Sequence, residues 1–117
     1  KKKEEHVVKM LQLMAKSGKL VKISELDMGY NDAAGQPIMT ENLTEEQHKQ
    51  MRDYYKFIVG QYFKIVPLAQ QYGITQWCIT DAPKGSSWRG GEPTGLWNAN
   101  FLRKHTYAGF ADGLRGE

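Results

Sequence analysis

The order of its apolar runs is the feature that most constrains how this chain can fold. Two runs have the length and spacing of β-strands, at residues 20–27 and 74–80, and a long helical pattern separates them. Strands joined by a helical crossover run parallel, because the helix returns the chain to the same end of the sheet. A parallel sheet needs covered faces and neighbouring strands, which two strands cannot supply. The sequence therefore predicts an α/β unit that belongs to a larger sheet.

Helical patterns lie on either side of the first strand. Residues 4–16 carry apolar side chains at helical spacing, and Gly18 ends this helix because glycine accepts the left-handed cap conformation. Thr44 and Gln47 have the spacing of a capping box, which predicts the start of the second helix. That helix is expected to end or kink near Pro67, which cannot donate a helical hydrogen bond.

The second strand is followed by a long loop and a last helix. Asn98 or Asn100 is expected to cap that helix, whose apolar positions are Phe101, Leu102, Tyr107, Phe110 and Leu114. Both long loops, residues 28–43 and 81–97, follow strands, and both short links precede them. In a βα barrel the loops after the strands carry function. The chain therefore resembles the closing part of such a barrel, with the earlier strands absent.

Composition narrows the classes of protein. The 117 residues suffice for one small domain, 1–117, and a hydrophobic content of 40% is too high for a disordered chain. The net charge of +3 comes largely from the first three residues and is offset by the next two, which gives nucleic-acid binding little support. Neither a membrane span nor a signal peptide is expected. The single Cys78 excludes an internal disulfide, and no Cys and His cluster has metal-ligand spacing.

Two carboxylates stand at the end of the first strand. Glu25 and Asp27 are two residues apart, so their side chains should point to one face. Retaining glycoside hydrolysis needs two carboxyl groups about 5–5.5 Å apart, and an acid on a rigid strand end suits the attacking role. Spacing alone favours a simpler interpretation, in which Glu25 is exposed or salt-bridged and Asp27 caps a turn. In either case the general acid should come from the opposite wall.

Aromatic residues follow the second strand. Tryptophan faces stack on the C–H surface of sugar rings while the indole N–H donates a hydrogen bond. Trp77 fits a core position and a sugar platform equally well, whereas Trp88, in a glycine-rich loop, favours binding. Arg89 is expected to pair with Asp81 or with an acid elsewhere, or to be solvated. Trp97 is expected to pack before the last helix.

These segments resemble the endo-β-1,4-xylanases of glycoside hydrolase family 10. Residues 21–27 (VKISELD) are similar to the family's strand-seven motif. Residues 73–81 (GITQWCITD) and 87–89 (SWR) resemble strand eight and its loop, and 95–101 with 104–107 resemble the run into the last helix. The similarity covers nearly the whole chain in order and at matching spacing. It implies a retaining (β/α)8 TIM barrel, of which this chain is the last two βα units with the preceding helix, incomplete alone.

The resemblance also implies roles for individual residues. Glu25 aligns with the catalytic nucleophile, and Asp27 aligns with an acid that orients a neighbouring histidine and the nucleophile. Trp77 and Trp88 align with aromatic residues that wall the sugar subsite beside the cleavage point. The resemblance implies that Arg89 is a substrate-binding residue as well. No cofactor or metal is implied.

The chain departs from the family pattern at single positions and by the absence of two motifs. Cys78 stands where a glycine is usual, and His105-Thr106 replace a usual Pro-Ala. The Asn-Glu motif that carries the acid/base and the strand-six histidine are missing. The resemblance therefore implies two partners: xylan or a xylo-oligosaccharide, and the amino-terminal part of the same barrel. It also implies a secreted or periplasmic location.

Rival functions differ in what the chain would do with xylan. An inactive barrel fragment would bind sugar through its tryptophans without cleaving it. A β-1,4-glucanase would prefer cellulose-like substrates. A small α/β interaction protein would be a stable monomer that ignores xylan.

Overall fold

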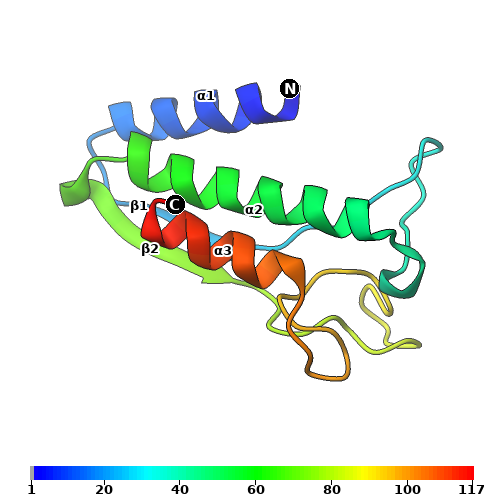
Figure 1. Cartoon of the computed structure of the whole chain (residues 1–117). Helices are drawn as coiled ribbons and strands as arrows, with labels where there is room; N and C mark the ends of the chain where they lie inside the picture. Colours follow the sequence, from blue (N-terminus) through cyan, green and yellow to red (C-terminus); the bar gives the residue numbers. More distant parts are fainter. Residues whose placement is uncertain (1) are drawn as a thin grey trace.

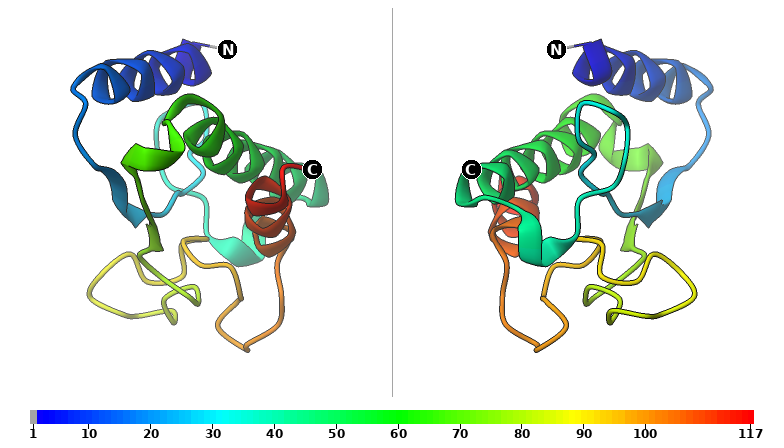
Figure 2. Two further views of the ribbon diagram at one scale, coloured as in Figure 1. Left: turned by 90° about the vertical axis from the view of Figure 1, so that its left-hand side faces the viewer. Right: turned by 90° about the vertical axis from the view of Figure 1, so that its right-hand side faces the viewer.

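The computed structural model describes residues 2–117, and it has three helices packed on one side of a two-stranded sheet (Figures 1 and 2). The two strands pair in parallel. The elements follow in the order α1 (Lys2–Lys16), β1 (Val21–Leu26), η1 (Thr40–Asn42), α2 (Glu45–Ile65), η2 (Leu68–Gln70), β2 (Gln71–Gln76) and α3 (His105–Arg115), where η marks a short 3₁₀ turn. The predicted element order and the parallel pairing are confirmed. Both long loops gather at the carboxyl end of the strands, at the right of Figure 1.

Helix α2 is the centre of the core, because it packs against both strands and both other helices. It begins with the predicted capping box: Thr44 Oγ1 accepts from the Gln47 amide (3.1 Å), and Gln47 Oε1 accepts from the Thr44 amide (2.9 Å). The Tyr62 hydroxyl donates to the Val21 carbonyl (2.6 Å) and accepts from the Gly73 amide (3.0 Å), which joins α2 to both strands. The buried residues of its inner stripe are Met51, Tyr55, Val59 and Tyr62, and the next residue after the helix, Val66, is buried too.

Helix α3 lies very close to α2 because glycines occupy the contact. A Cβ atom added at Gly109 would collide with the Arg52 carbonyl oxygen, and one added at Gly113 would lie 2.8 Å from Val59 Cβ. No larger residue fits these positions without moving backbone or core atoms. The two helices therefore form a rigid support behind the sheet.

A β-bulge in β1 interrupts the alternation of its side chains between the two faces of the sheet. Val21, Ile23 and Leu26 turn toward the helices, although Ile23 and Leu26 are three residues apart rather than two. The pairing register shifts between these two residues, so Ser24 and Glu25 are both exposed. A β-bulge of this kind inserts an extra residue and re-aims the side chains around it. The strict alternation expected over residues 20–27 is therefore interrupted just before Glu25.

The second strand lies earlier than the predicted range 74–80. It comprises Gln71–Gln76 because its partner β1 ends at Leu26, whose carbonyl accepts the Trp77 amide (2.9 Å). Beyond this point the chain pairs with its own loop: the Asp81 amide donates to the Trp97 carbonyl (2.9 Å). Long-range pairing therefore ends the strand before the apolar pattern does.

The last helix begins later than predicted, after Lys104, and has no side-chain cap. The expectation that Asn98 or Asn100 caps it is wrong. The Asn98 side-chain oxygen instead accepts from the backbone amides of Asn100 (2.9 Å) and Leu102 (3.0 Å), closing a separate turn. Phe101 lies in that turn with a φ of +64° and is exposed.

Candidate active site

The face of the sheet turned away from the helices is open to solvent. Lys22, Ser24 and Glu25 of β1 are exposed, and so are Tyr72 of β2 and the adjoining Trp77. Since Leu26 pairs with Gln76, Glu25 and Trp77 come at neighbouring strand ends. Within residues 2–117 the Glu25 carboxylate forms no ion pair. This carboxylate is therefore available to a molecule that approaches the open face.

Arg89 bridges the loop after β2 to the end of β1. Its Nη1 lies 3.1 Å from Asp27 Oδ1, and its Nε donates to Glu92 Oε2 (2.8 Å). A Cβ atom added at Gly29 would lie 2.5 Å from Arg89 Nη2, so the guanidinium lies directly against the Gly29 backbone. Of the alternatives that the sequence leaves open, Arg89 therefore pairs with acids other than Asp81. The Asp27 carboxylate serves as one anchor of this arginine.

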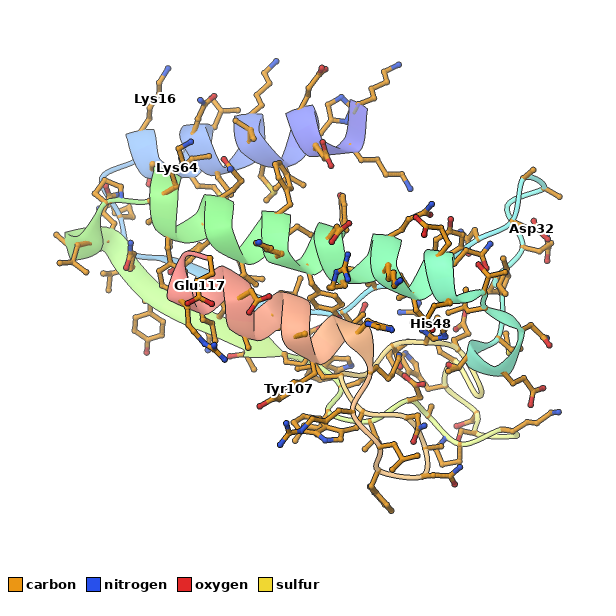
Figure 3. All side chains as sticks on the ribbon, in the orientation of Figure 1. Lys16, Asp32, His48, Lys64, Tyr107 and Glu117 are labelled. Carbon is orange, nitrogen blue, oxygen red and sulfur yellow. The ribbon has the colours of Figure 1, made fainter. Side chains whose placement is uncertain are left out.

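The tryptophans divide into two classes. Trp77 and Trp88 are 52% and 44% exposed, which rules out a buried core position for either within this structure. The Arg89 guanidinium lies 5.4 Å from the Trp88 ring centroid, within cation–π range. Trp97 instead packs against Tyr107 on α3, which Figure 3 labels, with ring centroids 4.9 Å apart. The packing role predicted for Trp97 is confirmed.

Asp81 and Lys104 form a buried ion pair beneath these loops, and the sequence interpretation missed Lys104. The two side chains are 2% and 4% exposed, with Lys104 Nζ 2.7 Å from Asp81 Oδ1. Burial lowers the pKa of Lys104, and the hydrogen bond and negative charge of Asp81 oppose that shift. The one available signal was a lysine directly before a helix, where Ser, Thr, Asp or Asn normally caps. Asp81, on the parity of Trp77, turns inward instead of joining it on the open face.

Other chemistry has less support in the described part of the chain. Within residues 2–117, no group of three or more His, Cys, Asp or Glu side chains is arranged to hold a metal ion. No helix in that range is long and apolar enough to cross a membrane. Cys78 is half-buried, and burial raises the pKa of its thiol, so it lacks the thiolate character of a nucleophile.

The model of the family "Glycosyl hydrolase family 10" matches residues 1–113. This chain belongs to glycosyl hydrolase family 10. The family's fold is a (β/α)8 barrel, and the mixed α/β unit with a parallel strand pair is a part of it. Among curated proteins, no relative matches the chain.

Solved structures of family 10 xylanases are similar to the chain. A thermostable mutant of a xylanase from Cellvibrio japonicus is 26% identical with a TM-score of 0.78, over 97% of this chain and 36% of that protein. A mutant of another xylanase from the same organism, in complex with xylopentaose, is 27% identical with a TM-score of 0.76, over 93% of this chain and 24% of that protein. The chain thus spans about a third or less of the length of the family 10 xylanases that it matches.

Proposed function

We propose that this chain is the carboxy-terminal part of a retaining endo-β-1,4-xylanase, contributing strands seven and eight of the barrel. The observation that carries the proposal is the exposed Glu25 carboxylate, free of ion pairs within the described range, at the bulged end of β1 beside Trp77. In a family 10 chain, a carboxylate in this position suits a nucleophile.

The proposed reaction proceeds by double displacement. A Glu25 carboxylate oxygen attacks the anomeric carbon of a xylose residue as the bond to the leaving oxygen breaks, and a second carboxylic acid gives that oxygen its proton. Water then attacks the anomeric carbon of the covalent intermediate, the second residue takes the proton from the water, and Glu25 leaves as a carboxylate. In this proposal the acid/base comes from barrel strands outside residues 1–117.

The neighbours of Glu25 suit supporting roles in this reaction. Trp77 and Trp88 present indole faces that can stack on a xylose ring beside the cleavage point. Asp27 orients the site through its contact with Arg89, and Arg89 in turn stands beside Trp88. The contact between Arg89 and Asp27 thereby fixes the distance between the end of β1, which carries Glu25, and the loop that carries Trp88.

The proposed partners follow from the same geometry. The similar structures include a xylanase in complex with xylopentaose, which supports xylan or a xylo-oligosaccharide as the substrate. The open face and the free strand edges suit the amino-terminal part of the barrel, which would wall the substrate from the other side. A secreted or periplasmic location belongs to the proposal, because xylan is a polymer outside the cell.

The test uses the complete enzyme, meaning this chain with its amino-terminal strands supplied in the same polypeptide or as a second chain. Glu25→Ala should lower hydrolysis of xylan by roughly 10⁵-fold, the scale of losing a covalent nucleophile, with an unchanged fold by circular dichroism. Added azide should partly restore turnover of an activated aryl xyloside by taking the nucleophile's place, giving a glycosyl azide of inverted configuration.

Glu46→Ala is the matched control, because Glu46 is an exposed acid on the first turn of α2. It should retain nearly full activity. Full activity in Glu25→Ala would overturn the nucleophile assignment. A wild-type enzyme that cleaves cellulose in preference to xylan would indicate the glucanase, and one that binds xylan without releasing reducing sugar would indicate a binding fragment.

A further inference from the structure

The buried ion pair between Asp81 and Lys104 lies where three segments of the chain meet. Asp81 lies in the loop after β2, Lys104 precedes α3, and Thr40 belongs to η1 in the loop after β1. Lys104 Nζ lies 2.7 Å from Asp81 Oδ1, and the Thr40 hydroxyl donates to Asp81 Oδ2 (2.8 Å). One carboxylate therefore holds both long loops at the carboxyl end of the strands.

The same pair closes the base of the loop that carries Trp88. The Gly95 amide donates to Asp81 Oδ1 (2.8 Å), and Lys104 Nζ donates to the Gly95 carbonyl (3.0 Å). The Thr106 hydroxyl also donates to that carbonyl (3.1 Å). A Cβ atom at Gly95 would collide with the Thr80 backbone, so the two ends of the loop are in direct contact here.

One backbone hydrogen bond ties the loop to η1, and a second one closes the loop on itself. The Thr40 amide donates to the Gly91 carbonyl (2.8 Å), and the Gly91 amide donates to the Ala82 carbonyl (2.9 Å). Trp88 and Arg89 lie between these ties and are themselves half-exposed. Their position relative to β1 is therefore set by the buried network below them and by the contact between Arg89 and Asp27.

We propose that Asp81 and Lys104 are positioning residues, which hold Trp88 and Arg89 at the separation from Glu25 that a bound xylose requires. Both side chains are buried, so neither touches the substrate. Two buried charges carry a desolvation penalty, and such a pair is weak evidence of stabilisation in its own right. The hydrogen bonds that the pair forms with Thr40 and Gly95 fit a role in selecting one loop conformation. This inference rests on the proposed function.

A second ion pair in the molecule provides a matched control. Lys84 Nζ lies 3.1 Å from Glu41 Oε1 and links the same two loops, but these side chains are 80% and 60% exposed. Exposed pairs contribute little to conformation because water and salt screen them. Lys84→Met and Lys104→Met thus each remove one lysine charge from an ion pair at the same end of the molecule, once at the surface and once in the interior.

The test measures KM and kcat of the complete enzyme on xylopentaose, with active sites counted by titration. Lys104→Met and Asp81→Asn should raise KM roughly tenfold or more, because small displacements of positioning groups weaken substrate contacts strongly. Lys84→Met should change KM less than twofold. Thr40→Val removes a single hydrogen bond to Asp81 and should give an intermediate rise, which keeps the test available if Lys104→Met does not fold.

A merely structural role predicts a different pattern. Lost stability would reduce the number of active molecules and leave the KM of the survivors unchanged, and that result would overturn the proposal. The double variant Lys104→Met, Asp81→Leu separates the two effects further. Removing both charges should recover stability, while KM should stay high because leucine cannot bind the Gly95 amide or the Thr40 hydroxyl.

A spectroscopic measurement keeps this inference separate from the proposed function. In ¹H–¹⁵N spectra of the complete enzyme, the Trp88 indole and Arg89 Nε–H signals should shift or broaden in Lys104→Met and stay in place in Lys84→Met. Unmoved signals in Lys104→Met would contradict the positioning role even if xylan is hydrolysed. Moved signals in an enzyme that does not cleave xylan would support the positioning role while the proposed function fails.

Discussion

The two faces of the β1–β2 sheet differ in almost every physical respect. On the helical face, Val21 and Leu26 are buried against α2, and Tyr62 satisfies backbone groups of both strands. On the opposite face, Glu25 and Trp77 are exposed, and each strand has an unpaired edge. The helical face has the dense packing of a protein interior. The open face has the character of an interface, so the chain is best understood as one wall of a larger barrel.

The rigid part of the chain and the part with exposed polar groups lie on opposite faces of the sheet. The closed face is built from apolar side chains and close helix contacts, which make it rigid. The open face carries the Glu25 carboxylate and the Trp77 indole, and the loop beside it carries Trp88 and Arg89, which contacts Asp27 at the end of β1. The proposed catalytic role of the open face needs this rigid support, because catalytic groups must be held in place before the substrate arrives.

The largest expected effect concerns the open face as a whole. The 117 residues expressed alone should aggregate or fold partially, because free strand edges and exposed side chains such as Tyr72, Trp77 and Ile79 lack their covering partners. Size-exclusion chromatography with light scattering and urea unfolding test this. Co-expression with the amino-terminal strands should restore a single species. A monodisperse chain with a cooperative unfolding transition on its own would break the comparison between the two faces.

A smaller effect, on the free energy of unfolding, is expected at the close contact between α2 and α3. Gly109→Ala should destabilise the complete enzyme by about 1–3 kcal/mol, because the added methyl group meets the Arg52 backbone. Gly60→Ala, also within a helix, meets no atom within 4 Å and should stabilise by about 0.5–1 kcal/mol through helix propensity. Urea unfolding midpoints of the two variants measure the difference. Equal midpoints would show that α2 and α3 are less tightly packed than described.

The smallest expected effect is a pH dependence at the loop-bearing end of α2, where His48 lies (Figure 3). Burial lowers the pKa of His48, the positive charges of Lys104 and His105 lower it further, and Glu45 and Asp81 oppose them. The folded state thus favours neutral His48, so its contribution to stability is complete above about pH 6.5 and declines as pH falls toward the lower folded pKa.

His48→Gln should remove that part of the pH dependence. Unfolding midpoints measured between pH 8 and pH 5 should fall less steeply in the variant than in the parent enzyme. A parallel fall in both would show that His48 does not contribute.

Features encoded within a few residues could be predicted from the sequence. The capping box at Thr44 and Gln47 is local, and so is the alternation of helical and strand patterns that gives the parallel pairing. The end of β2 and the start of α3 could not be predicted from local patterns. They depend on pairing of Asp81 with Trp97 and on the turn closed by Asn98, which compete with the local preference.

The candidate site shows the same division. The exposed positions of Glu25 and Trp88 agree with what spacing and loop composition indicate. Lys104 is 23 residues from Asp81, and Asp27 is 62 residues from Arg89, so local sequence patterns do not identify either pairing. Interactions of this kind become visible only once the loops are folded against one another.

The most direct test of the central claim is to trap the nucleophile covalently. An activated 2-deoxy-2-fluoro-xylobioside forms the glycosyl-enzyme, and its fluorine slows the second step enough for mass spectrometry. In the complete enzyme, the tryptic peptide spanning residues 23–49 should carry the sugar, and fragmentation should assign it to Glu25. A label on any other carboxylate, or an active enzyme that forms no covalent adduct, would contradict the assignment of Glu25 as the nucleophile.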